Sequence, residues 1–330
     1  MLTERIPYRL RQIDRLGIGT PLLVPSFSSR GFPDVASIIE ALRVDISGAC
    51  LLSAFDIAQG HVPEAFEELA DMILVDSGLY ETSPIADAVD CFQPDPIRAA
   101  WTRDHYHSFL KSAAVRVANT NALVVSFDSY APLEKQIEDA HADFALAPSA
   151  ARDFLLKPGL LGQVYVCSEV VGANLNGFEV IGVTERELGR SAIDRCRALL
   201  DLRAVIDAAG GTIPIHVFGS ITPAAVTAYF LCGADIFDGL NWLRVCLDAA
   251  WAGAPSEFAV TGRLFEAGDE AVLLELWRRN LRTLKRTQIA LRRFATDGDR
   301  QALCHVLPFA ISSLALADTA KAQSHRPGRK

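Results

Sequence analysis

Three short apolar runs in this chain each stop on an aspartate, at Asp76, Asp128 and Asp238. A run of aliphatic and β-branched residues that ends on a carboxylate is typical of a buried parallel strand with a charge at its C-terminal end. In a closed α/β barrel these ends converge on one pocket, where catalytic residues lie. The three aspartates therefore favour acid/base or nucleophilic chemistry over a simple binding surface.

Strand-like runs alternate with longer amphipathic stretches through the first three quarters of the chain. The runs predict strands over residues 22–24, 49–53, 73–76, 123–127, 163–166, 179–183, 213–218 and 235–237. The stretches between them predict helices, for example over residues 33–42, 64–70, 97–118, 191–209 and 223–231. Eight such units favour the α/β class and a (β/α)8 TIM barrel. A doubly wound open sheet is the competing topology, but the Gly-rich dinucleotide fingerprint that would favour it does not follow the first strand.

The last quarter of the chain is rich in Leu, Glu and Arg with helical periodicity. It predicts a long helix over residues 268–296 and a final helix over 301–317 that is broken near Pro308. No repeat or low-complexity linker divides the 330 residues, so we expect a single domain. We expect the barrel over about residues 20–250, an outer helical extension over 251–318, where a second copy or a partner subunit could bind, and a disordered tail over 319–330.

Composition narrows the possible partners and the compartment. The formal net charge of −8 provides no global basic field for nucleic acid. No apolar run is long enough to span a membrane and the first residues lack a signal-peptide core, so we expect a cytoplasmic protein. A local basic rim, or simply a solvated helix face, could be formed by Arg278, Arg279, Arg282, Lys285, Arg286, Arg292 and Arg293.

The seven cysteines are scattered and never spaced as CxC or CxxC. This argues against a disulfide framework and against a compact structural zinc site. Cys304-His305 is the only Cys/His neighbour pair. We therefore expect no metal and no cofactor.

The first two aspartates each lead into a turn. After Asp76 come Ser77 and Gly78, and the glycine would let the backbone approach a ligand closely. Tyr80 could then lay its ring against a planar substrate, or simply pack at the barrel rim. Asp128 could accept two hydrogen bonds from an edge such as guanine presents. For both carboxylates the structural alternative is a helix N-cap.

The longest coherent segment precedes the third aspartate. Residues 216–223 suggest a strand, a turn at Gly219 and a helix that starts at Thr222-Pro223. Residues 231–238 then lead through a short strand to Asp238. An aspartate behind a complete βαβ unit is a sharper signal than an isolated one.

These motifs, in this order, resemble the tRNA-guanine transglycosylase superfamily, the queuine and archaeosine transglycosylases with relatives that insert 7-deazaguanine bases into DNA. Residues 76–80 (DSGLY) are similar to the family's Asp-Ser-Gly-Gly-aromatic motif, and residues 127–130 (FDSY) partly match its Phe-Asp-Glu-Cys motif. Residues 233–238 (GADIFD) resemble its last motif. The resemblance runs from about Thr20 to Arg244.

The resemblance implies a base-exchange transglycosylase that replaces guanine in RNA or DNA with a 7-deazaguanine base. It implies that Asp238 is the nucleophile that attacks C1′ and forms a glycosyl–enzyme ester. Asp76 would be the general acid/base, and Asp128 would hold the Watson–Crick edge of the base. In a polymer the target base must leave its stack, which costs least in a loop or a single strand.

Further binding roles follow from the same resemblance. Tyr80 and Phe218 would stack on the two faces of the base. Gly182 would donate its backbone N–H to the base carbonyl, and Arg244 would lie near the phosphate backbone. The remaining substrate-binding positions would be Ser77, Gly78 and Gly219.

The chain also departs from the family pattern. The family's zinc site is absent after the third aspartate. Leu79 and Glu81 replace a glycine and a glutamine of the first motif. The fifth-strand Gly-x-x-Gln-Gly motif aligns with residues 162–166, which places Tyr165 at the glutamine, and a basic run is reduced to residues 241–244. The base and the polymer therefore stay open.

Two further hypotheses remain. One is a hydrolase of a deazapurine nucleoside or nucleotide, which the acidic charge and the missing zinc site favour. The other is a degenerate barrel that binds a base or a protein partner without chemistry. The loss of the family's glutamine and of its zinc site favours this last hypothesis, and the retention of all three aspartates opposes it.

Overall fold

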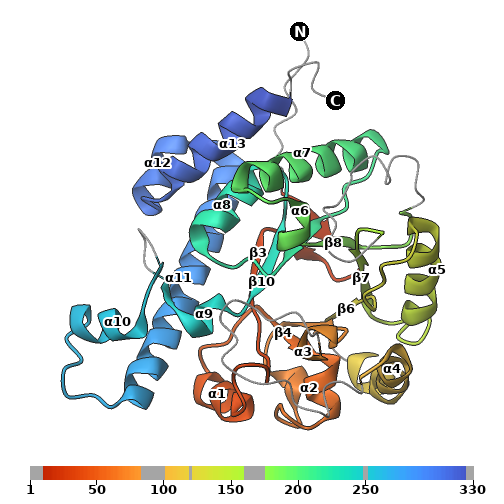
Figure 1. Ribbon diagram of the computed structural model, residues 1–330, viewed down its shortest axis with the longest axis horizontal. Coiled ribbons are helices and arrows are strands. Elements are labelled where there is room, and N and C mark those ends of the chain that lie inside the picture. Colours follow the sequence, from red (N-terminus) through yellow and green to blue (C-terminus); the bar gives the residue numbers. More distant parts are fainter. Residues whose placement is uncertain (1–9, 83–100, 119–120, 160–174, 248–251, 325–330) are drawn as a thin grey trace.

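The computed structural model describes residues 10–82, 101–118, 121–159, 175–247 and 252–324. From β4 to β10 each strand pairs in parallel with the next, and β10 also pairs with β3. A parallel bridge between Ser26 and Leu51 joins β3 to β4 and closes the ring. The predicted (β/α)8 barrel is thus confirmed (Figure 1). Its strands are β3 (Leu22–Pro25), β4 (Ala49–Ser53), β5 (Met72–Asp76), β6 (Ala122–Val125), β7 (Ala151–Leu156), β8 (Val180–Thr184), β9 (Ile215–Phe218) and β10 (Ile236–Gly239).

Seven of the eight barrel strands overlap their predicted positions, but the fifth does not. The fifth strand is β7, whereas the stretch predicted for it, residues 163–166, lies outside the described residues. The prediction missed β7 because Arg152 and Asp153 interrupt its apolar pattern. Asp153 is nevertheless fully buried. Its Oδ2 lies 2.7 Å from Nδ1 of His216 inside the barrel, and this pairing offsets the cost of burying the carboxyl group.

Helices surround the ring of strands (Figure 1). The predicted helix over residues 64–70 is wrong, because only a 3-10 turn at Phe66–Glu68 forms there. None of the described helices has both the length and the apolar character needed to cross a membrane. The helices that follow barrel strands are α1 (Val35–Leu42), α2 (Ala54–Ala58), α3 (Leu79–Thr82), α4 (Arg103–Ala118), α5 (Leu133–Phe144), α6 (Glu185–Leu188), α7 (Ala192–Ala208), α8 (Pro223–Leu231) and α9 (Asn241–Arg244).

The inside of the ring is closed at one end. Alternate strand residues such as Leu22, Val24 and Leu74 face inward and form an inner core. A hairpin of β1 (Gln12–Ile13) and β2 (Ile18–Gly19) adds the fully buried Ile13 to this core. The hairpin therefore covers the N-terminal ends of the strands, and the C-terminal ends form the open mouth.

The C-terminal segment completes the helical layer. After the short strands β11 (Cys246–Leu247) and β12 (Ala252–Gly253) comes α10 (Pro255–Thr261). The long α11 (Asp269–Asp297) then contacts β3, α8, α9 and α1, as expected for the last helix of the ring. α12 (Arg300–Val306) leads to α13 (Ala310–Ser324), which packs outside α7 and α8. The break near Pro308 is confirmed, whereas the predicted disorder does not begin at residue 319.

Asn280 of α11 fixes the segment that follows β10. Its buried amide donates to the carbonyls of Trp242 (2.6 Å) and Val245 (2.8 Å) and accepts from the N–H of Leu247 (2.8 Å). These three bonds hold α9, which carries Arg244, at the mouth of the barrel.

We expect Asn280→Ala to lower the free energy of unfolding by about 2–4 kcal/mol, because it leaves three buried backbone groups without partners. Urea unfolding followed by circular dichroism measures this loss. The matched control is Arg282→Ala on the exposed face of the same helix, which we expect to change stability by less than about 0.5 kcal/mol. Equal losses in both variants would contradict this role of Asn280.

Candidate active site

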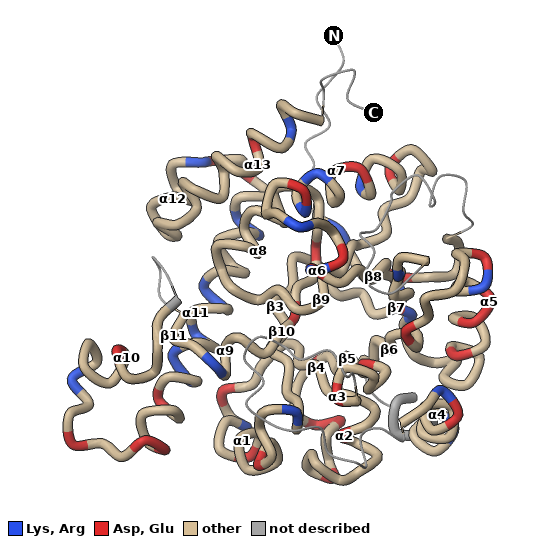
Figure 2. The backbone as a smooth tube through the Cα atoms, in the orientation of Figure 1, with Lys and Arg blue, Asp and Glu red and all other residues tan. Residues whose placement is uncertain are grey.

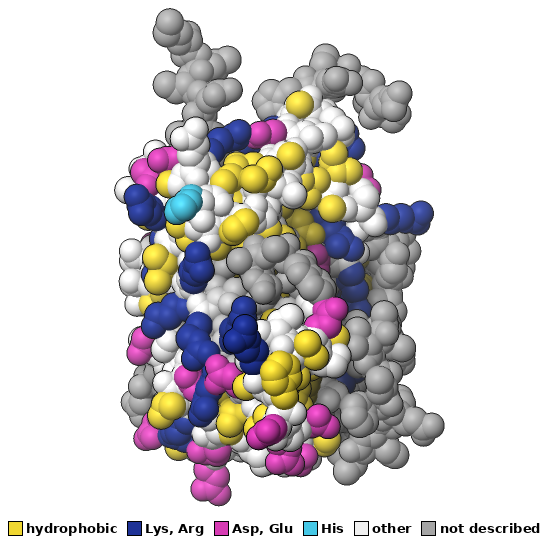
Figure 3. Space-filling view, turned by 90° about the vertical axis from the view of Figure 1, so that its left-hand side faces the viewer, with side chains coloured by type: hydrophobic (Ala, Val, Ile, Leu, Met, Phe, Trp, Pro, Cys, Tyr) yellow, Lys and Arg dark blue, Asp and Glu magenta, His cyan; other side chains and the backbone are white. Residues whose placement is uncertain are grey.

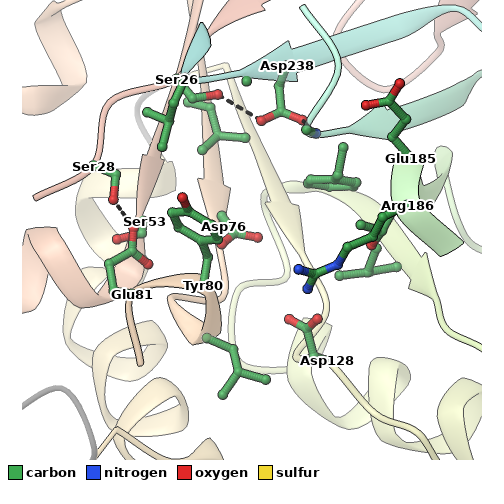
Figure 4. A pocket seen from close by; sticks show the side chains of 18 of the residues that line it. Ser26, Ser28, Ser53, Asp76, Tyr80, Glu81, Asp128, Glu185, Arg186 and Asp238 are labelled. Atoms are coloured by element: carbon green, nitrogen blue, oxygen red, sulfur yellow. Dashed lines mark hydrogen bonds between the residues drawn. The ribbon is translucent and has the colours of Figure 1, made fainter. Parts of the chain in front are cut away.

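A cavity of about 550 Å³ lies at the C-terminal mouth of the barrel (Figure 4). Asp76 at the end of β5, Asp128 after β6 and Asp238 of β10 all line it. Seven of the ten site residues predicted from sequence line this cavity: the three aspartates, Tyr80, Phe218, Gly219 and Arg244.

Asp238 is held by hydrogen-bond donors on both of its carboxylate oxygens. The Ser26 hydroxyl donates to Oδ2 (2.7 Å), as Figure 4 shows, and the Gly219 N–H donates to Oδ1 (3.1 Å). Gly219 can present its N–H because it turns with a φ of +82°, which a side chain would disfavour. These donors stabilise the ionised carboxylate, so the Gly219 turn serves Asp238 directly.

A third group beside Asp238 is His216, which does not itself line the cavity. Its Nε2 lies 3.3 Å from Oδ1 of Asp238, and its Nδ1 lies 2.7 Å from Oδ2 of Asp153. Burial alone would lower the pKa of His216, but the two carboxylates outweigh it and raise that pKa to about 9. Sequence reasoning gave neither His216 nor Asp153 a role. The signal available for Asp153 was a polar residue within a strand-like run, and the signal for His216 was a histidine among apolar residues.

Asp76 has a different environment from Asp238. It is half-buried, and one of its oxygens accepts from the N–H of Gly78 (3.3 Å). Burial, followed by the negative charge of Asp128, raises the pKa of Asp76 to about 7. At neutral pH this carboxyl can therefore both give and take a proton.

Asp128 is bound to a lysine that the sequence analysis did not single out. Lys157, which directly follows β7, is 4% exposed, and its Nζ lies 2.8 Å from Oδ1 of Asp128. It also lies 2.8 Å from the Thr184 hydroxyl and 3.3 Å from Glu187. Burial would lower the pKa of Lys157, but Asp128 and Glu187 raise it above its usual value. The predicted base-recognition carboxylate is thus already paired with a cation.

Glu81 adds a buried carboxyl group with a raised pKa. It lines the cavity, is 4% exposed, and accepts a 2.6 Å hydrogen bond from the Ser28 hydroxyl (Figure 4). Burial, then the charges of Asp56 and Asp76, raise the pKa of Glu81 to about 8. The sequence analysis noted Glu81 only as a departure from the family motif.

Aromatic rings and arginines also line the cavity, among them Tyr80, Phe218, Arg186 and Arg244. The Tyr80 hydroxyl accepts from Arg244 (3.2 Å), and the guanidinium carbon of Arg30 lies 4.8 Å from the Tyr80 ring centre. The Phe218 ring lies over His216, with 3.8 Å between ring centres. Arg186 of α6 extends into the cavity on the side of Asp128 (Figure 4).

The other three predicted residues, Ser77, Gly78 and Gly182, do not line the cavity. Ser77 is fully buried and donates from Oγ to Asp128 (3.0 Å). A Cβ on Gly78 would lie 2.8 Å from Phe55, so this glycine allows a close approach of the protein to itself. A Cβ on Gly182 would lie 2.5 Å from Phe218, which occupies that space instead.

No metal centre is evident in the described ranges. Within them, no group of three or more His, Cys, Asp and Glu side chains is arranged to hold a metal ion.

Comparison with known proteins does not assign the chain to a family. A scan against models of protein families finds no match, and a search of curated proteins finds none either. The chemistry of the cavity is therefore the basis for a functional conclusion.

The raised pKa of Glu81 makes stability depend on pH. Between its ordinary value of 4.5 and about 8 the folded protein keeps a proton that the unfolded chain loses, so stability falls as pH rises through this window. Glu81→Gln keeps the shape of the neutral acid and removes the free-energy cost of holding a proton on this residue at high pH. We expect the variant to match the wild type near pH 5 and to be more stable by about 1–3 kcal/mol near pH 8.5.

Thermal unfolding at both pH values measures this difference. Glu266→Gln, at an exposed position, is the control and should show no such pH-dependent gain. A Glu81→Gln variant that is equally stabilised, or equally destabilised, at both pH values would show that Glu81 is ionised in the folded protein.

Proposed function

We propose that this protein is a base-exchange transglycosylase that replaces guanine in a nucleic acid with a 7-deazaguanine base through a covalent Asp238–glycosyl intermediate. One observation carries the proposal: two unlike carboxylates line the same cavity. Hydrogen bonds from Ser26 and Gly219 stabilise the ionised form of Asp238, whereas the pKa of Asp76 is raised to about 7. One suits a nucleophile and the other a proton donor at neutral pH.

The proposed reaction has two displacement steps. In the first, an oxygen of Asp238 attacks C1′ and the bond from C1′ to the guanine nitrogen breaks. The electron pair of that bond stays on the nitrogen, which takes a proton from Asp76. In the second, Asp76 accepts the proton of the incoming base nitrogen, which attacks C1′. The electrons of the C1′–O bond then return to Asp238 as a carboxylate.

Other side chains of the cavity supply recognition. Tyr80 and Phe218 offer aromatic surfaces for a planar base. Asp128 keeps acceptor sites for an N–H edge, because a carboxylate can accept about four hydrogen bonds and Lys157 and Ser77 occupy two. The resemblance implies a glutamine at the end of the fifth strand. Because that strand is β7, we assign this position to Lys157 rather than to Tyr165. Tyr165 itself lies outside the described residues.

Basic side chains near the mouth and on the outside would contact phosphates. Arg186 and Arg244 line the cavity. Basic residues also follow α11 in Figure 2, and Figure 3 shows Lys and Arg side chains gathered on the side of the molecule where α11 lies. The exposed residues of this kind on α11 are Arg282, Lys285, Arg286 and Arg293.

A hydrolase of a deazapurine nucleoside or nucleotide is the second candidate, in which water attacks C1′ in the second step. The formal net charge of −8 favours it, since a polymer of phosphates is repelled by excess negative charge.

Covalent trapping tests the proposal. We expect the wild type, mixed with short RNA or DNA hairpins and a 7-deazaguanine base, to form an adduct on the peptide that contains Asp238. Denaturing gels and mass spectrometry detect it. Asp238→Asn should form none, and exchange should fall by at least about a thousandfold, because the nucleophile is lost.

Other outcomes would point elsewhere. Free base released without a second base present would favour the hydrolase. Tight binding of base with no adduct on any polymer would indicate a barrel that binds without chemistry. Full exchange activity of Asp238→Asn would contradict the proposed mechanism.

The first step should also depend on the protonation of Asp76. Because its pKa is about 7, the fraction able to donate a proton falls as pH rises above 7. We expect the single-turnover rate of adduct formation to drop about tenfold per pH unit above that point. In Asp76→Asn the rate should be low and flat across the same range. An alkaline limb that survives in this variant would assign the proton donor to another group.

A further inference from the structure

We propose that Asp153 and His216 are positioning residues for Asp238: they form a buried carboxylate–imidazolium–carboxylate array that keeps the nucleophile ionised and favours its release from the glycosyl ester. This inference rests on the proposed function, in which Asp238 attacks the substrate. It assigns a task to two residues that do not line the cavity and do not touch the substrate.

The array spans three strands of the barrel. Asp153 comes from β7, His216 from β9 and Asp238 from β10. Nδ1 of His216 lies 2.7 Å from Asp153, and Nε2 lies 3.3 Å from Asp238. Asp153 and His216 are fully buried, so water does not screen the charges. A buried imidazolium is costly alone, and the two flanking carboxylates offset that cost.

The neighbouring strand β8 is built to admit this array. It presents Gly182 between Asp153 and Phe218, where a Cβ would lie 2.8 Å from Oδ1 of Asp153 and 2.5 Å from the Phe218 ring. The missing side chain lets Phe218 lie over the imidazole and separate it from the cavity. In the described part of the chain, Asp153 and Asp238 are the charged groups that act on His216.

A purely structural pair would need only Asp153 and His216. The second nitrogen, however, lies 3.3 Å from Oδ1 of Asp238, the same oxygen that accepts from Gly219, at ion-pair distance and without a hydrogen bond. The negative charge of Asp238 disappears when the ester forms and returns when the ester breaks. A fixed positive charge 3.3 Å away therefore favours the carboxylate both before attack and as the leaving group.

Three variants separate this role from simple packing. His216→Gln removes the charge and can still bond to Asp153, and Asp153→Asn removes the anion that holds the charge in place. Asp235→Asn is the matched control, because Asp235 is also fully buried but bonds to Arg11 (2.9 Å) and to the N–H of Ile215 rather than to a side chain of the array. All three can lose stability, and only the first two should alter the chemistry of Asp238.

We expect a longer-lived adduct in His216→Gln and Asp153→Asn. In the presence of the incoming base the trapped adduct should last about ten times longer than in the wild type, because its leaving group has lost the positive charge. Folded variants that keep the wild-type adduct lifetime would overturn the proposal, as would an equal change in Asp235→Asn.

A measurement that needs no substrate separates the array from the proposed function. In protein labelled with ¹⁵N-histidine, we expect His216 to stay protonated above pH 8, in accord with its pKa of about 9. Asp153→Asn and Asp238→Asn should each lower its titration midpoint by about one unit or more. A neutral His216 at pH 7 overturns the array. A charged His216 in a protein that forms no adduct supports the array and contradicts the transglycosylase.

Discussion

Closure of eight parallel strands into a ring is the constraint on which the rest of the structure depends. Parallel pairing points every strand end in one direction, and closure brings strands that are far apart in the sequence to one rim. Asp76 and Asp238 belong to distant parts of the chain and line one cavity for this reason. The same geometry crowds like charges, which a folded protein must stabilise locally.

The crowding is resolved in three different ways, and these differences give the cavity its chemistry. Asp238 is stabilised as an anion by Ser26, Gly219 and His216. Asp128 is paired with Lys157. Asp76 has no such cation among the described residues, and burial and its neighbour Asp128 raise its pKa. Similar carboxylates of one cavity thus differ in electrostatic environment because their partners differ.

Local patterns in the sequence were enough to predict the architecture and seven of the residues that line the cavity. A strand that ends on Asp76 or Asp238 is visible as an apolar run, and closure brings such ends together. The fifth strand could not be found in this way, because Arg152 and Asp153 interrupt its apolar pattern and His216, the partner of Asp153, is distant in the chain. Because the fifth strand was predicted at the wrong residues, Lys157 was also missed: its pairing with Asp128 depends on where that strand ends.

The hairpin that covers the N-terminal end of the barrel has a consequence for the proposed reaction. Ile13 fills the inner core below the site, so in the described structure the cavity has no opening in that direction. If the outgoing and the incoming base both pass through the mouth, they must do so in turn. The glycosyl group would then wait on the protein while the mouth empties, and exclusion of water during that interval would decide between exchange and hydrolysis.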